Sequence, residues 1–167
     1  MKVNRLGKGF ILHFMFAMMA LPVLAQNKAQ KLEQFRQLME SKVFVFVAQS
    51  ATPASGSMIQ LDSNYYLKIN KDSLESYLPY YGVAYQARFG STDSPMQFES
   101  TDFDYTSTVT KNGNYDITIR MIDPKDPNQL NLSVSTSGYA SLRVISMQRQ
   151  AITFYGEVVP PKAPKKQ

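Results

Sequence analysis

Alternation of apolar and polar residues runs through the C-terminal half of this chain and constrains its fold more than any other feature. Five segments between Phe103 and Val158 alternate in this way, and Ser107 and Gly156 interrupt the apolar positions of the first and last segments. Because side chains of a β-strand point alternately to opposite faces, each segment predicts a strand with one buried face. Asn112-Gly113 and Ser137-Gly138 predict turns, the former a two-residue hairpin with both residues at positive φ. We expect an antiparallel meander, because no long crossover segment separates the strands.

The preceding residues predict one helix and a central strand. Residues 27–41 carry Leu, Phe and Met at three- and four-residue spacing, which is typical of an amphipathic helix, and Asn27 is a suitable N-cap. Residues 43–48 are apolar at every position. A strand of that composition is covered on both faces, so we expect it in the middle of the sheet.

The segment that joins these two regions predicts shorter elements. Residues 51–57, rich in Ala, Ser, Pro and Gly, predict a loop, and residues 65–69 predict a short strand. Asp72 followed by Glu75 resembles a capping box and predicts a short helix that ends before Pro79. The alternating residues 83–89 predict another strand.

Together these elements predict the α+β class. We expect a twisted, mainly antiparallel β-sheet of about seven or eight strands, with the N-terminal helix packed on one face. A sheet of this size tends to curl, and a half-barrel is one form that it can take. The length of residues 26–159 predicts a single domain. Residues 160–167, rich in Pro and Lys, predict a disordered tail.

The first 25 residues have the features of a secretory signal peptide. Three basic residues among the first eight form an n-region, and residues 10–21 form an apolar h-region. Val23-Leu24-Ala25 supplies the small residues that precede cleavage, which we expect before Gln26. The predicted location of the protein is therefore periplasmic or secreted.

Removal of this leader would also remove His13, which is the only histidine. The remaining chain has no His, Cys or Trp. A serine or cysteine nucleophile usually needs a histidine as its base, and zinc sites use His and Cys ligands. The chain also lacks a glycine-rich phosphate loop and the S-x-x-K spacing of a Ser-Lys pair. We therefore expect no enzyme activity, no cofactor and no metal site.

The net charge of +5 does not indicate nucleic-acid binding. Three of the eighteen basic residues lie in the leader and three in the tail, and the remaining twelve face thirteen acidic residues. A nucleic-acid interface needs a basic face on the domain itself. No segment after the leader approaches the ~20 apolar residues of a membrane span. We expect a monomer with no membrane span.

A cluster of tyrosines is the first candidate binding site. Tyr77, Tyr80, Tyr81 and Tyr85 lie within nine residues, with Arg88 close behind. Tyrosine combines a broad apolar face with a polar tip, which suits sugars, peptides and amphipathic small molecules. The alternative is packing, in which the same side chains fasten a turn to the sheet.

Arginines provide a second candidate. Arg149 lies in the turn between the last two predicted strands, and Arg120 and Arg143 lie on polar strand faces. If the strands bring them together, they could bind an anionic group; otherwise they are solvated or paired across strands. The predicted ligand-binding residues are therefore Tyr77, Tyr80, Tyr81, Tyr85, Arg88 and Arg149.

Carboxylates provide weaker candidates. Glu99, Asp102 and Asp104 precede the meander, and Asp102 and Asp104 on one strand face would lie ~7 Å apart. Paired acids of glycoside hydrolases have such a separation, but Asp is also common on exposed strand faces. Residues 123–128 contain Asp and Asn without EF-hand spacing, so we expect an ordinary long turn there.

Three segments carry aromatic and turn residues in a distinctive order: residues 72–82, residues 138–144, and residues 146–150 followed by Ile152, Phe154 and Gly156. In these segments the chain resembles a family of small exported domains of unknown function from gut-dwelling Gram-negative bacteria. The likeness extends over roughly residues 39–159. It implies an exported location and a similar fold, and it assigns no catalytic residue. Many members look like lipoproteins, whereas this chain has no cysteine to carry a lipid.

These observations lead us to expect an exported, non-enzymatic binding module of the bacterial cell envelope. Its ligand would be a glycan, a peptide or an amphipathic small molecule. One alternative is a structural or assembly partner in the envelope that docks another chain by strand addition. A less favoured alternative is a hydrolase that uses carboxylates alone.

Overall fold

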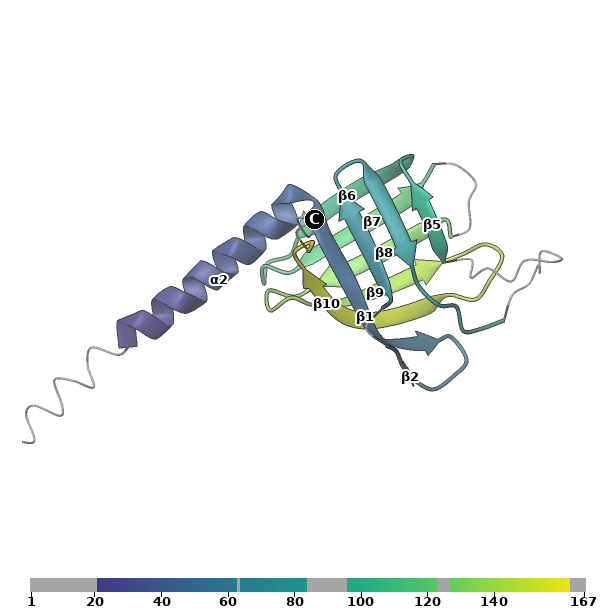
Figure 1. Cartoon of the computed structure of the whole chain (residues 1–167), viewed down its shortest axis with the longest axis horizontal. Helices are drawn as coiled ribbons and strands as arrows, with labels where there is room; N and C mark the ends of the chain where they lie inside the picture. The colour runs from purple at the N-terminus through teal and green to yellow at the C-terminus, as the bar shows by residue number, and fades with distance from the viewer. Residues whose placement is uncertain (1–20, 63, 84–95, 123–126, 163–167) are drawn as a thin grey trace, which may run out of the picture. The chain divides into compact units, whose positions relative to one another are not determined.

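The computed structural model describes residues 21–62, 64–83, 96–122 and 127–162, with side chains from residue 29 onward (Figure 1). The chain divides into two compact units, one up to Arg36 and one from Gln37. Helix α2 (Leu21–Ser41) confirms the predicted helix and begins six residues earlier than expected. Lys42 follows with φ of 55°, the left-handed conformation that commonly ends a helix. The described part of the chain contains no helix with the length and apolar character to span a membrane.

The second unit is built on a single sheet in which all hydrogen-bonded neighbours among the described strands are antiparallel. Its strands are β1 (Val43–Pro53), β2 (Ile59–Gln60), β3 (Tyr66–Asn70), β4 (Ser73–Tyr77), β5 (Gln97–Ser100), β6 (Phe103–Val109), β7 (Tyr115–Met121), β8 (Gln129–Val134), β9 (Tyr139–Ile145) and β10 (Ile152–Val159). Their order is β5-β4-β3-β1-β10-β9-β8-β7-β6, and β2 pairs with β1. The α+β class, the central position of β1 and the five-strand meander from β6 to β10 are thus confirmed.

The two edge strands show that the sheet curls into a nearly closed barrel. β5 and β6 lie at opposite ends of the strand order, yet only Thr101 and Asp102 separate them in sequence. Two linking residues span only about 10 Å, so the two edges must approach each other at this link. In Figure 1, β1 and β5 accordingly pass in front of β7, β8 and β9.

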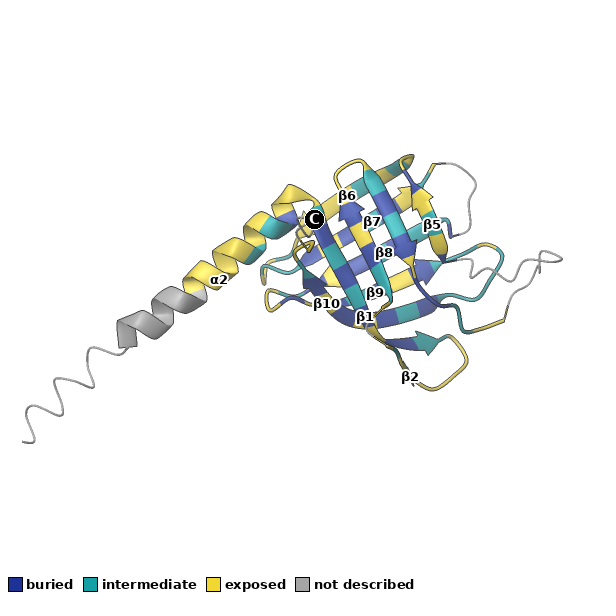
Figure 2. Cartoon of the chain, in the orientation of Figure 1, coloured by how far each residue is buried: buried dark blue, intermediate teal, exposed yellow. Residues whose placement is uncertain are grey.

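The interior of the barrel is the core predicted by the alternating pattern. Buried and exposed residues alternate along most strands, as the colours in Figure 2 show. Phe46 lies between Leu67 and Val158 in the cross-strand register, and Phe154 lies between Ala51 and Leu142. Of these six residues, five are 0% exposed and Val158 is 6% exposed. Cross-strand neighbours on the inner face therefore form one continuous core.

Gly156 occupies the one strand position where β10 meets a bulge in β1. The register between β1 and β10 shifts between Ala48 and Ser50, and Gly156 is the partner of Ala48. A Cβ atom on Gly156 would lie 1.9 Å from the carbonyl oxygen of Val47. The close approach of the two backbones therefore requires glycine at this position.

Both predicted hairpins are present, but the turn at Asn112-Gly113 differs from the one expected. Gly113 has φ of 80° and Gly138 has φ of 89°, whereas Asn112 does not have positive φ. Gly113 donates its N–H to Thr110 O at 2.9 Å, and Gly138 donates to Ser135 O at 2.9 Å. This pattern is typical of a three-residue loop with a glycine bulge, in which only the glycine needs a positive φ.

The prediction of a helix after Asp72 is wrong, because residues 73–77 form the strand β4. Ser73 pairs with Asn70, so Lys71 and Asp72 make a tight hairpin, with Lys71 at φ of 48°. Ser76 points inward and its hydroxyl donates to Met96 O at 2.7 Å. The apolar–polar alternation of this strand was not recognisable in the sequence, because a core-facing position holds a serine. The pairing with β3 outweighed the local preference for a helix cap at Asp72.

Three smaller expectations have different outcomes. β1 extends to Pro53, so the loop predicted at 51–57 begins only at residue 54. Of the strand predicted at 83–89, all residues but Val83 lie outside the described part of the chain. No sequence signal predicted β2 or β5, which bring the sheet to ten strands.

Candidate functional site

The structure separates the tyrosines that the sequence places together. Tyr77 is an exposed residue of β4, while Tyr80 and Tyr81 follow β4 and are half-buried. Tyr85 and Arg88 lie outside the described residues. The described members of the predicted cluster therefore belong to two different surroundings.

Tyr80 and Arg149 are brought together at the connection between β9 and β10. The Tyr80 hydroxyl lies 3.0 Å from Val83 O and 3.2 Å from Gln150 O, and its proton can be donated to either carbonyl. The Arg149 guanidinium lies 5.4 Å from the centre of the Tyr80 ring. These contacts fasten residues 80–83 to the β9–β10 connection, as the packing alternative requires. A ligand-binding role for Tyr80, Tyr81 and Arg149 remains a prediction.

Tyr77 instead joins Tyr65 and Tyr66, which were not among the predicted binding residues. Its ring stacks on Tyr65 and Tyr66, with centroid distances of 5.8 and 5.9 Å. Tyr66 is the cross-strand partner of Tyr77, so the stack follows from the pairing of β3 with β4. The Tyr66 hydroxyl donates to Glu75 at 2.5 Å, and Lys68 Nζ donates to the other Glu75 oxygen at 3.0 Å.

This hydrogen-bond network shifts two pKa values in opposite directions. The hydrogen bond to Glu75 is the main reason that the pKa of Tyr66 is raised to about 12, with smaller contributions from burial and nearby carboxylates. Hydrogen bonds from Tyr66 and then Lys68 lower the pKa of Glu75 below its usual value. Glu75 is therefore an ionised acceptor at neutral pH, which is the opposite of what a general acid needs.

We expect the Tyr66–Glu75 contact to make stability depend on pH at both extremes. Folding lowers the pKa of Glu75, so its contribution is present above pH ~4.5 and lost as the pH falls. Folding raises the pKa of Tyr66, so its contribution is present below pH ~10 and lost between pH 10 and about 12. Both side chains are partly exposed, so screening by solvent keeps the effect below ~1 kcal/mol.

Urea unfolding of the wild type and of Glu75→Gln between pH 3 and pH 12 measures the difference in their free energies of unfolding. The wild type is expected to be more stable at pH 7, and the two proteins should converge at pH 3 and pH 12. Thr108→Val, on the outer face of β6, is the control and should change stability equally at every pH. A difference between wild type and Glu75→Gln that is constant with pH would contradict the assignment.

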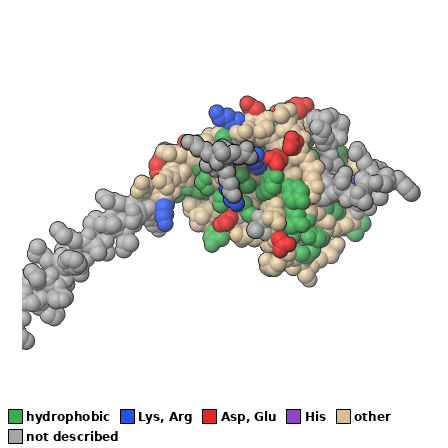
Figure 3. Space-filling view, viewed as in Figure 1, with side chains coloured by type: hydrophobic (Ala, Val, Ile, Leu, Met, Phe, Trp, Pro, Cys, Tyr) green, Lys and Arg blue, Asp and Glu red, His purple; other side chains and the backbone are tan. Residues whose placement is uncertain are grey.

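An apolar patch adjoins the tyrosine stack. Val45, Val47 and Val159 line a groove of about 370 Å³ together with Tyr66 and the Pro160-Pro161 segment. Figure 3 shows hydrophobic side chains gathered on this face of the second unit, with acidic and basic side chains among them. The apolar composition of residues 43–48 predicted that both faces of this strand are covered. On its outer face, Tyr66 and the Pro160-Pro161 segment provide part of that cover.

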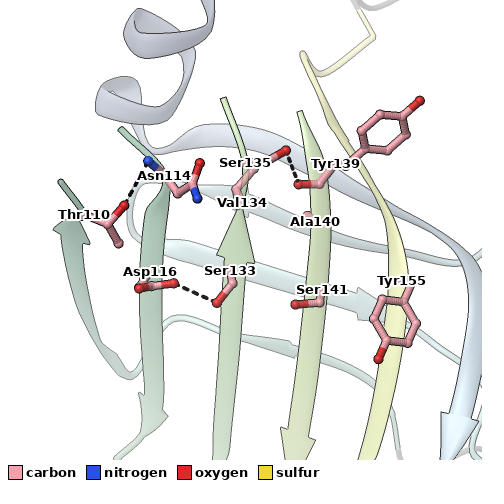
Figure 4. A pocket seen from close by; sticks show the side chains of 10 residues that line it. All are labelled: Thr110, Asn114, Asp116, Ser133, Val134, Ser135, Tyr139, Ala140, Ser141 and Tyr155. Carbon is pink, nitrogen blue, oxygen red and sulfur yellow. Dashed lines mark hydrogen bonds between the residues drawn. The ribbon is translucent and has the colours of Figure 1, made fainter. Parts of the chain in front are cut away.

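A second hollow, also of about 370 Å³, lies on the outer face of β7 to β10 (Figure 4). Asp116, Ser133, Ser141 and Tyr155 are successive cross-strand partners and form one row across the four strands. Tyr155 is 47% exposed. The row therefore presents a carboxylate, two aliphatic hydroxyls and an aromatic ring to solvent.

The two glycine hairpins form the upper end of this hollow. Asn114 Oδ1 accepts the backbone N–H of Thr136 at 3.3 Å, which ties the first hairpin to the second. The Ser135 hydroxyl lies 3.0 Å from Tyr139 O. Tyr139 is 67% exposed, and in Figure 4 its ring points away from the row. The backbone at this end is fixed, while the Tyr139 side chain is exposed.

Asp116 is the only charged side chain among the described residues that line this hollow. Its Oδ1 accepts the Ser133 hydroxyl at 2.7 Å. A carboxylate has about four lone-pair positions, so further donors can be bound. The hollow can thus hold a ligand through hydroxyl groups, one carboxylate and a tyrosine ring.

The predicted carboxylate pair has a different setting. Asp104 lies on β6 opposite Arg120, whereas Asp102 precedes the strand and lines a pocket of about 290 Å³ with Glu75 and Glu99. Within the described ranges, no group of three or more Asp, Glu, His or Cys side chains could hold a metal ion. Asp123 and Asp126 fall outside those ranges.

Comparison with protein families identifies the chain. A family described as a domain of unknown function, DUF4251, matches residues 26–158. The chain belongs to the DUF4251 family. A solved crystal structure of a DUF4251 protein from Bacteroides eggerthii DSM 20697 is also similar, with a TM-score of 0.54 and 14% sequence identity. The match covers 79% of this chain and 89% of the Bacteroides chain, and at this identity it shows a shared fold alone. No curated protein matches the chain.

The resemblance inferred from three sequence segments is thereby confirmed as membership of DUF4251, while gut origin and export remain predictions. Tyr139 and Tyr155 of this DUF4251 domain, which line the second hollow, were not among the binding residues predicted from the sequence. A signal was present, because both occupy polar positions in the alternation of their strands. A large aromatic residue on a solvent-facing strand position is a better indication of a binding surface than aromatic residues close together in sequence.

Proposed function

We propose that this DUF4251 domain is a non-enzymatic binding module of the bacterial cell envelope, and that the hollow on β7 to β10 is its ligand site. The observation that carries the proposal is the row of Asp116, Ser133, Ser141 and Tyr155 in a hollow of about 370 Å³. Polar groups placed beside an exposed aromatic ring are typical of sites for small polar ligands.

The envelope location rests on the signal-peptide features of residues 1–25. The non-enzymatic character rests on the lack of His and Cys after residue 25 and on the lowered pKa of Glu75. The residue types that most often act as catalytic bases and nucleophiles, His and Cys, are thus missing after residue 25, whereas hydroxyl groups and tyrosines are exposed.

Arrays of glycans, peptides and amphipathic small molecules, probed with the purified protein, test this proposal. For each ligand found, calorimetric titration of Tyr155→Ala is expected to show at least tenfold weaker binding, because the ring forms one wall of the hollow. Tyr77→Ala, which removes a comparable exposed tyrosine on β4, is the matched control and should bind as the wild type does. Loss of binding in Tyr77→Ala alone would contradict the placement of the site.

An envelope assembly partner is the second candidate, favoured by one observation at the edge of the sheet. β6 ends the strand order of the described sheet. Val109 on β6 is 57% exposed, although its cross-strand partner Tyr115 is buried. An added strand would cover such an edge. Crosslinking in envelope fractions tests this function, and Thr106→Pro on the edge strand should abolish the crosslink.

A further inference from the structure

The lining of the hollow indicates which class of ligand it takes. We infer that the hollow on β7 to β10 binds a neutral or cationic saccharide and disfavours an acidic one. This inference rests on the proposed function, because it names the ligand of the same site. It follows from three features of the hollow: the polar row of Asp116, Ser133 and Ser141, the Tyr155 ring, and the negative charge of Asp116.

The floor of the hollow suits a ligand that carries many hydroxyl groups. Neighbouring strands lie about 4.8 Å apart, so the row from Asp116 through Ser133 and Ser141 to Tyr155 extends roughly 14 Å. A hydroxyl donates one hydrogen bond and accepts two, as the ring hydroxyls of a saccharide do. Successive sugar residues along this row can therefore exchange hydrogen bonds with each strand in turn.

Other ligand classes fit the floor less well. A peptide bound by strand addition pairs with an exposed strand edge, whereas β7, β8, β9 and β10 all have a neighbour on both sides. An apolar ligand needs apolar side chains, but Val134 and Ala140 in the lining are buried because they belong to the inner face. The tyrosine rings are the exposed apolar surface that remains.

Tyr155 ends the row with an aromatic side chain that forms one wall of the hollow (Figure 4). A tyrosine ring presents an apolar face with a polar tip, which matches a sugar ring with its C–H face and its hydroxyl rim. Tyr139 is the more exposed of the two tyrosines, and exposed side chains change rotamer within nanoseconds. Its ring can therefore turn toward a bound ligand.

The charge of the hollow selects against anions. Asp116 is the charged member of the described lining, and Glu157 lies opposite Tyr139 in the register at the upper end. Arg143 follows Ser141 by two residues on the same face of β9 but is not part of the lining. An amino sugar would gain an ion pair with Asp116, whereas a uronate would meet a like charge with no cation in the lining.

The test compares three tetrasaccharides that differ in charge: tetra-N-acetylglucosamine, tetraglucosamine and tetragalacturonate. We expect the first two to bind and tetraglucosamine to bind about two- to fivefold more tightly at low salt, the range of an exposed ion pair. Tetragalacturonate should bind at least fivefold more weakly than the neutral ligand. Both differences should fade in 1 M salt, where the Debye length is ~3 Å.

The substitution Asp116→Asn removes the charge of the hollow and nearly preserves its shape, so it tests the effect of charge on binding alone. The variant should bind the neutral and the cationic tetrasaccharide equally and bind tetragalacturonate more tightly than the wild type does. Asp104→Asn, which removes the same charge from β6 outside the hollow, is the control and should leave all three affinities unchanged. Tighter binding of tetragalacturonate by the wild type, equal binding of all three, or binding of none overturns the inference. A peptide that binds at Tyr155 would overturn the inference and leave the proposed function standing.

Discussion

Replacing Gly156 with alanine is expected to lower the free energy of unfolding by about 3 kcal/mol, at the upper end of the cost of overpacking a core. The added Cβ would lie 1.9 Å from Val47 O and 3.1 Å from Ala48 Cα. These are backbone atoms of the neighbouring strand, so no side-chain rotation can relieve the clash. β1 and β10 would have to separate at the bulge in the middle of the sheet.

Gly56→Ala is the matched control for this substitution. The Cβ atom added at Gly56 would meet Pro53 side-chain atoms at 3.6 Å or more, which is ordinary van der Waals contact. We expect a change within about 0.5 kcal/mol. Urea unfolding of both variants, with m-values compared to the wild type, gives the two free energies. Equal losses of stability in the two variants would contradict the backbone contact at Gly156.

Replacing Phe154 with alanine is expected to cost about 4 kcal/mol. Phe154 is 0% exposed and lies between Ala51 and Leu142 in the cross-strand register. Truncation loses the transfer free energy of the ring and leaves a cavity that the surrounding barrel fills only in part. The lost free energy should appear as a lower urea midpoint with little change in m-value.

Tyr155→Ala provides the comparison on the next residue of the same strand. Its side chain points to the outer face and is largely exposed, so we expect a loss below about 1 kcal/mol. Adjacent residues would thus differ severalfold in their effect on stability, because β10 has one buried and one exposed face. A larger loss from Tyr155→Ala than from Phe154→Ala would contradict the observed register.

The strands of the meander could be predicted because their signal is local. Ile117, Ile119, Leu130 and Leu132 repeat with a period of two, and all four are buried. The helix was predictable for the same reason, from its three- and four-residue spacing. β4 was not, because its inward position 76 is a serine whose hydroxyl finds a partner in Met96 O only in the folded chain.

The candidate site was harder to predict because proximity in sequence is a poor guide to proximity across a sheet. Tyr77 and Tyr80 are three residues apart, yet Tyr77 stacks on Tyr66 while Tyr80 contacts Arg149. Asp116 and Tyr155 are far apart in sequence and lie in one row. That row exists only when β7, β8, β9 and β10 are paired in their observed registers.

The order of residues alone therefore established the strand-rich class, the buried face of β7 to β10 and the N-terminal helix. These follow from backbone stereochemistry, which sets the direction of each side chain within a few residues. Tertiary structure decided that β5 and β6 meet at a two-residue link, that Gly156 faces the Val47 carbonyl, and that Asp116 shares a hollow with Tyr155. Such contacts depend on how the whole sheet buries its apolar surface. Many residues contribute together to the free energy of that burial.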